Sequence, residues 1–462
     1  MENKSAMNRS TTLFLSACLT LLGGASFLNA AGNGWYTEGD FAPGKRITVT
    51  LTNPLNVARK ECPITLQRTD LPDQNIQELW ITVVDPSLPP NPKDPTMEEL
   101  QKAGAELLRK ETNGHFLEYQ LDDVDRDGIW DELFFLTDLK PRETKAIQVY
   151  IGFTERGLIA HKTHAGLGYY GRHIVPFWEA EYIGWKLWYP TDVDMHGKRT
   201  PMLTAYPEYQ GNLGGYYMPM EMGTDIMSVA NTFGAGGICL FENAARPDSA
   251  SRPRFTPFSE KGPLHDTRYT FDVVSNGPLR SMIRATTMNW RSGQGEYALE
   301  QIYTAVAHKS YATCRVQYTE FNPVNRDVRF GCGIREIMNQ SDSFNQGGTV
   351  ISLGKDVNPY PPQTFSGSTI VAYQKFRVGF EAIAMVVKDS YQPKYSNIKG
   401  FSGNHVFSFP VTPDLKYEYM IAGAWNEGAV NKTPEEFKKY VLTEATMFNN
   451  PVKMTIGGME TK

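Results

Sequence analysis

Apolar and polar residues alternate along much of this chain with the period of two that is typical of β-strands. In the range 45–155 the alternation occurs in the short segments RITVTLTN, CPITLQ, ELWITVVD and KAIQVYIGF, which are rich in β-branched residues. Turn-forming residues separate them. We therefore predict a small β-sandwich domain over residues 45–155.

The same signal continues over 165–450 in longer segments. RYTFDVV and LRSMIRATTMNW flank SNGP, which predicts a hairpin, and EAIAMVVKD and KYEYMIAGAW follow. Consecutive strands without intervening helices favour a large sandwich over an α/β fold. Two capped segments, 96–111 and 433–448, predict helices. The expected fold class is all-β with few helices, in two domains.

The first 30 residues have the pattern of a secretory signal peptide. Lys4 and Arg9 precede the apolar run LFLSACLTLLGGASFLNA, and small residues follow at Ala30. The run includes LSAC, ending at Cys18, which resembles a lipoprotein signal, but it stays apolar beyond Cys18. We expect cleavage near Ala30 and a periplasmic or secreted protein rather than one anchored at Cys18. No second long apolar segment follows, so no membrane span is expected.

Composition excludes one class of partner and one class of site. The formal net charge of −5 provides no basic field, so nucleic acid is not an expected partner. The cysteines beyond the signal segment form no CxxC pair, which argues against a zinc ribbon. We expect them to be small buried hydrophobic residues. They are Cys62, Cys239, Cys314 and Cys332.

An aspartate-rich loop, DDVDRDGIWD, predicts a calcium site. Alternate carboxylates around a glycine, Gly128, can converge on one hard cation, and Ca²⁺ takes six to eight oxygen ligands. The loop is not an EF-hand, because its twelfth position from the first ligand is Phe134. We expect a structural Ca²⁺ ion; the alternative is a solvated turn without metal. The expected ligands are the carboxylates of Asp123, Asp125, Asp127 and Asp131 and the carbonyl of Ile129.

Candidate chemistry lies further along, between Tyr169 and Tyr217, where aromatic residues are dense and mixed with histidines, arginines and glutamates. Rings stack on the apolar faces of sugars and polar groups bind the hydroxyls, so this segment predicts a saccharide site. The candidate substrate-binding residues are Tyr170, Arg172, Trp178, Trp185 and Tyr209. The candidate catalytic residues are His173, Glu179, His196 and Arg199.

Within WEAEYIGWKLWY, a period of two places Glu179, Glu181 and Trp185 on one face and Trp178 on the other. Two carboxylates on one face can act as an acid and a base, because proximity moves their pKa values apart. The alternative is that the rings belong to the core of the sandwich and the glutamates border it.

The chain resembles the domain of unknown function 4861 family. The resemblance runs from about Thr48 to Gly423 and rests on the segments DDVDRDGIWDELFFLTDLKPRETKAIQVYI, GRHIVPFWEAEYIGWKLWYP, FGAGGICLFEN and VVSNGPLRSMIRATTMNW. It implies a small β-sandwich joined to a galactose-mutarotase-like supersandwich. It also implies a place among Bacteroidetes proteins for the breakdown of polysaccharides, often uronate-containing ones. The chain departs from the family in GTDIMSVAN, where Asp225 is present but the histidine of many members is not.

Two functions follow from these observations. The first is an exported carbohydrate-active enzyme acting on a uronate-containing saccharide, either as a lyase or as a glycoside hydrolase. The second is a non-catalytic glycan-binding protein, which would keep the rings without an acid and base. Fold alone does not separate them, because function depends on the site.

Overall fold

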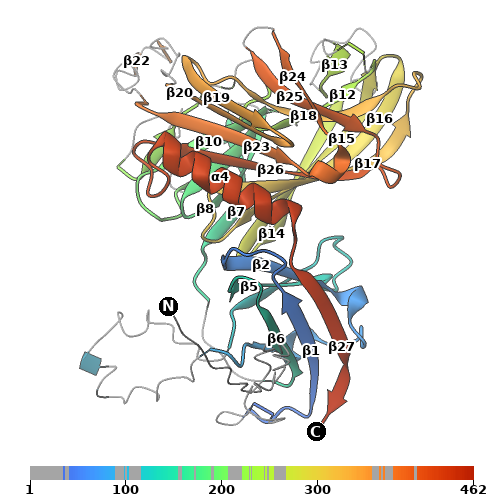
Figure 1. Ribbon diagram of the computed structural model, residues 1–462, viewed down its shortest axis with the longest axis vertical. Helices are drawn as coiled ribbons and strands as arrows, with labels where there is room; N and C mark the ends of the chain where they lie inside the picture. The colour runs from blue at the N-terminus through green and yellow to red at the C-terminus, as the bar shows by residue number, and fades with distance from the viewer. Residues whose placement is uncertain are drawn as a thin grey trace, which may run out of the picture.

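The structure is a computed structural model in which two β-rich domains lie one above the other (Figure 1). The segment 1–34 and most of the expected helix 96–111 lie outside the described residues. The described residues are 35–36, 41–88, 98, 101–102, 116–153, 159–170, 173–188, 192–205, 221–227, 229, 232–243, 245–246, 249–253, 267–355, 364–365, 368–369, 378–399 and 403–462.

The small domain is a sandwich of two antiparallel sheets. Alternate residues point inward, and Val49, Leu66 and Phe135 are fully buried between the sheets. One sheet has the order β27 (Lys453–Thr461), β1 (Lys45–Thr52), β6 (Thr144–Ile151) and β3 (Ile81–Val84). The other has the order β2 (Arg59–Gln67), β5 (Glu132–Leu139) and β4 (Tyr119–Asp122). Two 3₁₀ turns, Arg68–Asp70 and Glu78–Trp80, connect strands.

An eight-stranded antiparallel sheet is the centre of the large domain. Neighbours along the chain pair by hairpins at one side, as the SNGP turn predicts, and β26 returns from near the C-terminus to lie between β17 and β23. Its order is β14 (Arg268–Asn276), β15 (Arg280–Ser292), β16 (Gly295–Val306), β17 (Tyr311–Asn322), β26 (Lys416–Trp425), β23 (Glu381–Val387), β20 (Thr349–Gly354) and β19 (Gln340–Gln346).

Two five-stranded sheets cover the inner face of the eight-stranded sheet. One continuous apolar core lies between the eight-stranded sheet and the two five-stranded sheets. The first has the order β11 (Gly223–Asp225), β10 (Asp192–Lys198), β9 (Ile183–Trp188), β8 (His173–Ala180) and β7 (Thr163–Tyr170). The second has the order β13 (Ala250–Ser251), β12 (Gly237–Phe241), β18 (Arg329–Arg335), β25 (Asn404–Pro410) and β24 (Lys394–Ile398). A short pair, β21 (Thr364–Phe365) and β22 (Ser368–Thr369), and a 3₁₀ turn, Asp389–Tyr391, complete the elements.

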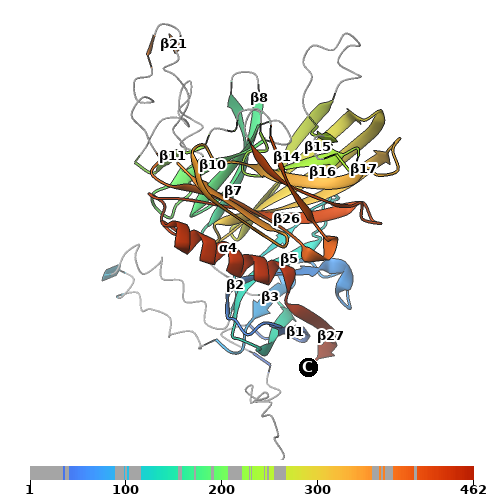
Figure 2. The same ribbon diagram turned by 45° about the horizontal axis from the view of Figure 1, so that its top comes forward.

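The helix α4 (Pro434–Asn449) packs on the outer face of the eight-stranded sheet (Figure 2). Its start is the one expected from sequence: the Thr433 hydroxyl accepts a hydrogen bond from the Glu436 N–H at 3.2 Å, and Pro434 occupies the first turn. Phe437 and Val441 form its buried stripe. After α4 the chain returns to the small domain, where β27 pairs with β1. β27 lies beyond residue 450, the predicted end of the large domain.

The all-β fold class is therefore confirmed. The cysteines also follow their prediction, because all four are buried and free of disulfides: Cys62, Cys239, Cys314 and Cys332. The detailed likeness to galactose mutarotase remains a prediction.

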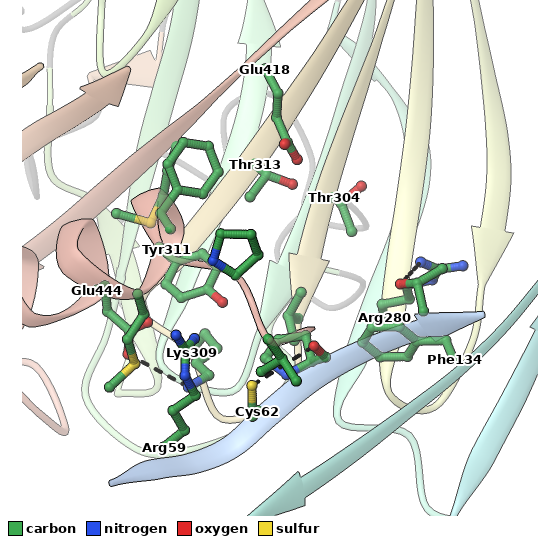
Figure 3. A pocket seen from close by; sticks show the side chains of 18 of the residues that line it. Arg59, Cys62, Phe134, Arg280, Thr304, Lys309, Tyr311, Thr313, Glu418 and Glu444 are labelled. Atoms are coloured by element: carbon green, nitrogen blue, oxygen red, sulfur yellow. Dashed lines mark hydrogen bonds and ion pairs between the residues drawn. The ribbon is translucent and has the colours of Figure 1, made fainter. Parts of the chain in front are cut away.

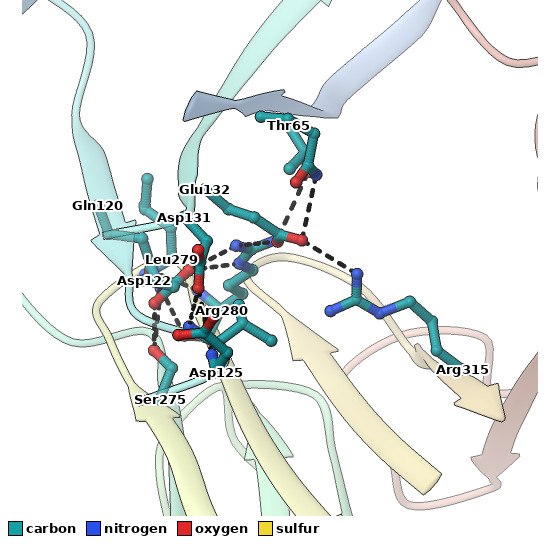
Figure 4. A network of polar contacts seen from close by, with 12 residues as sticks. Thr65, Gln120, Asp122, Asp125, Asp131, Glu132, Ser275, Leu279, Arg280 and Arg315 are labelled. Atoms are coloured by element: carbon teal, nitrogen blue, oxygen red, sulfur yellow. Dashed lines mark hydrogen bonds and ion pairs between the residues drawn. The ribbon is translucent and has the colours of Figure 1, made fainter. Parts of the chain in front are cut away.

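The two domains meet at a buried arginine, Arg280, at the start of β15 (Figure 4). Its Nη2 lies 2.6 Å from Asp122 Oδ2 and 2.6 Å from Glu132 Oε2, both in the small domain. Its guanidinium carbon also lies 4.4 Å from the centre of the Phe134 ring. The neighbouring Gln120 accepts hydrogen bonds from the Arg280 N–H and the Leu279 N–H, each 2.8 Å. This set of contacts fixes the β14–β15 hairpin onto β4 and β5.

We predict that replacing Arg280 with methionine (Arg280→Met) destabilises the protein by about 3–5 kcal/mol. The substitution keeps an apolar side chain over Phe134 but removes the buried cation that Asp122 and Glu132 share, and Glu132 then retains only the partly exposed Arg315 among the described residues. The free energy of unfolding from urea titration measures the effect. Arg291→Met is the matched control, because Arg291 is half-exposed and, within the described ranges, pairs with the exposed Glu296 alone; it should cost less than about 1 kcal/mol. Equal losses in both variants would contradict the account.

The junction also makes stability depend on acid pH. Burial raises the pKa of Glu132, but the charges of Arg280 and Arg315 outweigh burial and lower it to about 2, from an ordinary value of 4.5. A carboxyl whose pKa is lowered by folding stabilises the fold above its unfolded pKa and loses this contribution as the pH falls through the folded value. We expect the unfolding free energy of the wild type to fall between pH 4.5 and about 2, and to fall less steeply in Arg280→Met. Parallel pH profiles would rule this out.

Candidate functional site

The segment WEAEYIGWKLWY forms a hairpin rather than one continuous strand. β8 ends at Ala180 and β9 begins at Ile183, with a turn between them. Trp178 pairs with Trp185 across the hairpin, so both rings lie on the same face. The prediction that Glu179 shares a face with Trp185 is therefore wrong, because the turn breaks the period of two.

Trp178 and Trp185 belong to the core of the large domain. Their exposed fractions are 0% and 2%, and the Trp178 ring lies 4.6 Å from the ring of Tyr303 on the eight-stranded sheet. The prediction that these two rings bind substrate is corrected by this placement, because a ring buried between two sheets has no face for a sugar. The alternative, that the rings form the core, is the correct one.

Glu179 lies on the outer face of the five-stranded sheet formed by β7 to β11, opposite the face that carries Trp178 and Trp185. It belongs to a row of cross-strand neighbours. His164 on β7 pairs with Glu179, Glu179 with Gly184, Gly184 with His196, and His196 with Asp225 on β11. The glycine gives the two side chains room, because a Cβ there would lie 3.1 Å from the His196 Cβ, a tight contact. The structure thus brings Glu179 and His196 together across Gly184, and we call these five residues the polar row.

Glu179 is held as a permanent carboxylate. It forms an ion pair with the buried Lys198 and accepts hydrogen bonds from the Thr204 N–H at 2.9 Å and the Ala205 N–H at 3.0 Å; His164 Nδ1 lies 3.2 Å away. Burial raises the pKa of Glu179, but the Lys198 charge and these hydrogen bonds lower it to about 2. A carboxylate with this pKa cannot donate a proton near neutral pH.

Glu181, the expected partner of Glu179, lies elsewhere. It follows the end of β8 and contacts His308. The backbone N–H of His308 donates a hydrogen bond to the Glu181 carboxylate at 2.8 Å, and the ring Nδ1 of His308 lies 3.0 Å from the same carboxylate. This hydrogen bond raises the pKa of His308. The interpretation of Glu179 and Glu181 as an acid–base pair is therefore wrong, because each carboxylate is bound to a different base.

A second set of buried charges adjoins the row. Lys186 on β9 places its Nζ 2.8 Å from Asp225 Oδ2 and 3.3 Å from Asp194 Oδ2, so two carboxylates face one ammonium group. Asp194 also accepts hydrogen bonds from the Trp188 indole N–H at 3.1 Å and the Met195 N–H at 2.8 Å. All three charged groups are buried.

Asp225 is a carboxyl whose pKa is raised toward neutrality. Burial and the neighbouring Asp194 charge raise its pKa to about 6, against the opposing effect of Lys186 and His196. Two carboxyls that share a site hold one proton between them, since both cannot ionise freely. The row therefore combines an ionised Glu179 with an Asp225 that can give or take a proton near pH 6.

Of the other predicted site residues, Arg199 does not join this row. Arg199 points to the far side of β10, where its Nε lies 2.6 Å from Glu427 and its guanidinium lies over the Trp425 ring at 5.2 Å. Four predicted residues cannot be placed. Arg172 and Tyr209 lie outside the described residues, and for Tyr170 and His173 only the backbone, in β7 and β8, is described.

Lys186, Asp194 and Lys198 were missed by the sequence analysis. A signal for two of them was present: in DVDMHGK, Asp192, Asp194, His196 and Lys198 occupy every second position of one strand. Such a run of charged residues on one face of a strand usually indicates an exposed face, so period alone does not show that this face is buried.

The aspartate loop brings together three of its predicted ligands. One oxygen each of Asp123, Asp125 and Asp131 lies within 4.8 Å of the others. The Asp127 carboxylate instead accepts a hydrogen bond from the Ile129 N–H at 2.8 Å and is not part of this group. An all-oxygen set of this kind fits Ca²⁺. Arg126, between Asp125 and Asp127, is turned toward the large domain, where its Nη2 lies 2.7 Å from Asp272.

The helices among the described residues include none long and apolar enough to cross a membrane.

Comparison with solved structures finds two proteins from Enterococcus faecalis, a glycosyl hydrolase family 38 protein and an α-mannosidase. For the first the TM-score is 0.41 with 10% identity, covering 89% of this chain and 48% of that one. For the second it is 0.38 with 9% identity, covering 90% and 46%. This chain spans about half the length of each, and likenesses this low assign neither a fold nor a reaction.

None of the curated proteins compared matches this chain. The model of the family described as "Domain of unknown function (DUF4861)" matches residues 51–454, which is most of the sequence. The match spans the aspartate loop, the polar row and the hairpin of β14 and β15, the same segments that carry the resemblance in the sequence. The chain therefore belongs to the DUF4861 family.

Proposed function

We propose that this protein is an exported carbohydrate-active enzyme that acts on a uronate-containing saccharide. Export rests on the signal pattern of residues 1–30, and the substrate class rests on the family resemblance. The polar row of the five-stranded sheet is the proposed site of chemistry, with Asp225 as the group that transfers a proton.

One observation carries the proposal: Asp225 and Asp194 share Lys186, and the pKa of Asp225 is raised to about 6. A buried carboxyl with a near-neutral pKa costs folding energy, and such groups are concentrated at catalytic sites. Proton transfer by a positioned carboxyl contributes about 10²–10⁴-fold to a rate.

Hydrolysis is the reaction that this arrangement supports best. Glycoside hydrolases pair a carboxyl kept protonated near neutral pH with a second, ionised carboxylate. Asp225 fits the first role and Asp194 the second. A lyase needs a cation for the substrate carboxylate, and the two lysines of this face, Lys186 and Lys198, already pair with protein carboxylates. β-Elimination is thus the second candidate, with His196 as the base and Arg172 as the cation.

A glycan-binding protein without catalysis is the candidate from a different class. The observation that favours it is the burial of the row, because Glu179, His196 and Asp225 are each at most 5% exposed. Incubation with a panel of uronate oligosaccharides would distinguish the three functions. Unsaturated products would indicate a lyase, new reducing ends without unsaturation a hydrolase, and binding with neither signal a binding protein.

We also propose that the aspartate loop binds a structural Ca²⁺ ion. Asp123, Asp125 and Asp131 would supply carboxylate oxygens, and the ion would neutralise charges that no cation among the described residues offsets, since Arg126 pairs with Asp272. The loop begins directly after Asp122, a partner of Arg280, so the ion would stiffen the domain junction.

For the enzyme, we predict that Asp225→Asn lowers kcat about 100-fold or more on a cleaved uronate oligosaccharide, with little change in KM. The amide mimics the neutral acid and should leave the fold intact. If Asp225 is the acid, wild-type kcat/KM falls as the pH rises through about 6, and this limb disappears in the variant. Asp342→Asn, on exposed β19, is the control and should match the wild type. An unchanged kcat in Asp225→Asn would refute this role.

For the calcium site, we predict that EDTA lowers the melting temperature of the wild type. At a free Ca²⁺ concentration 100-fold above Kd, binding adds about 2.7 kcal/mol to the stability of the folded state. Asp125→Asn should reduce this Ca²⁺-dependent shift, while Asp138→Asn, which alters a carboxylate outside the loop, should retain it. Identical melting curves of the wild type with Ca²⁺ and with EDTA would show that the loop is only a solvated turn.

A further inference from the structure

A groove runs along the domain junction, on the opposite side of the large domain from the polar row. Its first hollow, of about 430 Å³, lies between β2 and β5 of the small domain and the outer face of β15, β16, β17 and β26. The C-terminal end of α4 closes one side. Figure 3 shows Thr304, Thr313 and Glu418 on the sheet, across from Arg59 and Cys62 on β2.

A second hollow, of about 660 Å³, continues the first along the sheet. Arg315 and Glu418 line both, so we treat the two as one feature, the junction groove. Each hollow has the size of a small-molecule site, and together they give an elongated shape suited to a chain of several units.

Cationic side chains outnumber carboxylates in the first hollow. Its lining includes Glu132, Glu418 and Glu444 as the carboxylates. The cations are Arg59, Lys60, Arg280, Lys309, Arg315 and Lys388. The second hollow, in contrast, has more acidic than basic residues in its lining. An anionic group would therefore be attracted to the domain-junction end of the groove.

Arg59 is the cation that most needs an anion. Its exposed fraction is 4%, and its two hydrogen-bond acceptors are neutral oxygens, the Asn53 side-chain oxygen at 3.0 Å and the Asn450 carbonyl. No carboxylate lies within ion-pair distance of it in the part of the chain that the structure describes. Lys309, 6% exposed, lies in the same hollow with its nearest carboxylate, Glu444, at 3.5 Å. Buried charges are ordinarily paired, so this end has the features of an anion site.

The remaining lining has the features of a saccharide site. Thr304 and Thr313 supply hydroxyls from adjacent strands, and the partly buried ring of Phe448 supplies apolar surface. In the second hollow Tyr391 adds a further ring. Rings and hydroxyls next to cations suit a ligand that has C–H faces, hydroxyls and carboxylates together.

We propose that the junction groove binds a carboxylate-bearing oligosaccharide, with one carboxylate at Arg59 and Lys309 and a neighbouring unit beside Arg315 and Lys388. The saccharide nature of the ligand rests on the proposed function; the anionic end follows from the groove itself. The groove is separate from the polar row, because the core of the large domain lies between the outer faces of the two sheets. It holds the polymer to the protein while the row acts on another part of it.

Binding of a galacturonate hexamer, measured by titration calorimetry at low ionic strength and pH 7, tests the proposal. The variant Arg315→Gln with Lys388→Gln neutralises two partly exposed cations of the groove, and Glu132 still keeps Arg280. The control variant, Arg291→Gln with Lys432→Gln, removes the same charge from exposed positions outside the groove. We expect at least about 10-fold weaker binding in the groove variant, wild-type binding in the control, and weak binding of the methyl-esterified hexamer to all three.

Three results would overturn the proposal: no detectable binding of the hexamer to the wild type, equal affinity in the groove variant, or equal affinity for the methyl ester. Asp225→Asn separates this proposal from the proposed function. Its binding of the hexamer in the groove should equal that of the wild type, because Asp225 does not line either hollow. If the wild type binds the hexamer in the groove but does not cleave it, the groove site is supported and the enzyme proposal is refuted. If cleavage depends on Asp225 but the groove variant binds as tightly as the wild type, the enzyme proposal is supported and the groove site is refuted.

Discussion

The pairing of Arg280 with Asp122 and Glu132 is the interaction on which the arrangement of the two domains depends. Buried ions add little net stability, because desolvation offsets much of their attraction, but removing one partner is costly. Such a pair therefore selects one relative position of the domains. Both proposed binding features adjoin this pairing, since the aspartate loop begins directly after Asp122 and the junction groove includes Arg280 and Glu132 in its lining.

The same rule organises the outer face of the five-stranded sheet. Lys198, together with hydrogen bonds from His164 and the Thr204 N–H, lowers the pKa of Glu179 to about 2, whereas Lys186 faces both Asp194 and Asp225. One cation for two carboxylates leaves one proton to be held, and Asp225 is the group whose pKa rises. The difference between the two lysines thus separates a structural carboxylate from one suited to proton transfer.

Much of the fold could be predicted from the sequence because strand alternation, hairpin turns and the Thr433 cap are local signals. The return of β27 to pair with β1 could not, since no local pattern specifies a pairing across the whole chain. For the site, the segment around Glu179 and His196 was found, but the faces were misassigned at the turn between Ala180 and Ile183. Lys186 and the groove residue Arg59 could not be found from sequence, because their importance comes from burial beside residues of other strands.

The central claim is that Asp225 exchanges a proton near pH 6, and carbon-13 NMR titration of aspartate carboxyl groups measures this directly. Comparison with Asp225→Asn assigns the signal. The account predicts an apparent pKa of about 6 for the carboxyl that the substitution removes. A value at or below the ordinary 3.8 would contradict it, because Asp225 would then be ionised throughout the neutral range and could not act as an acid.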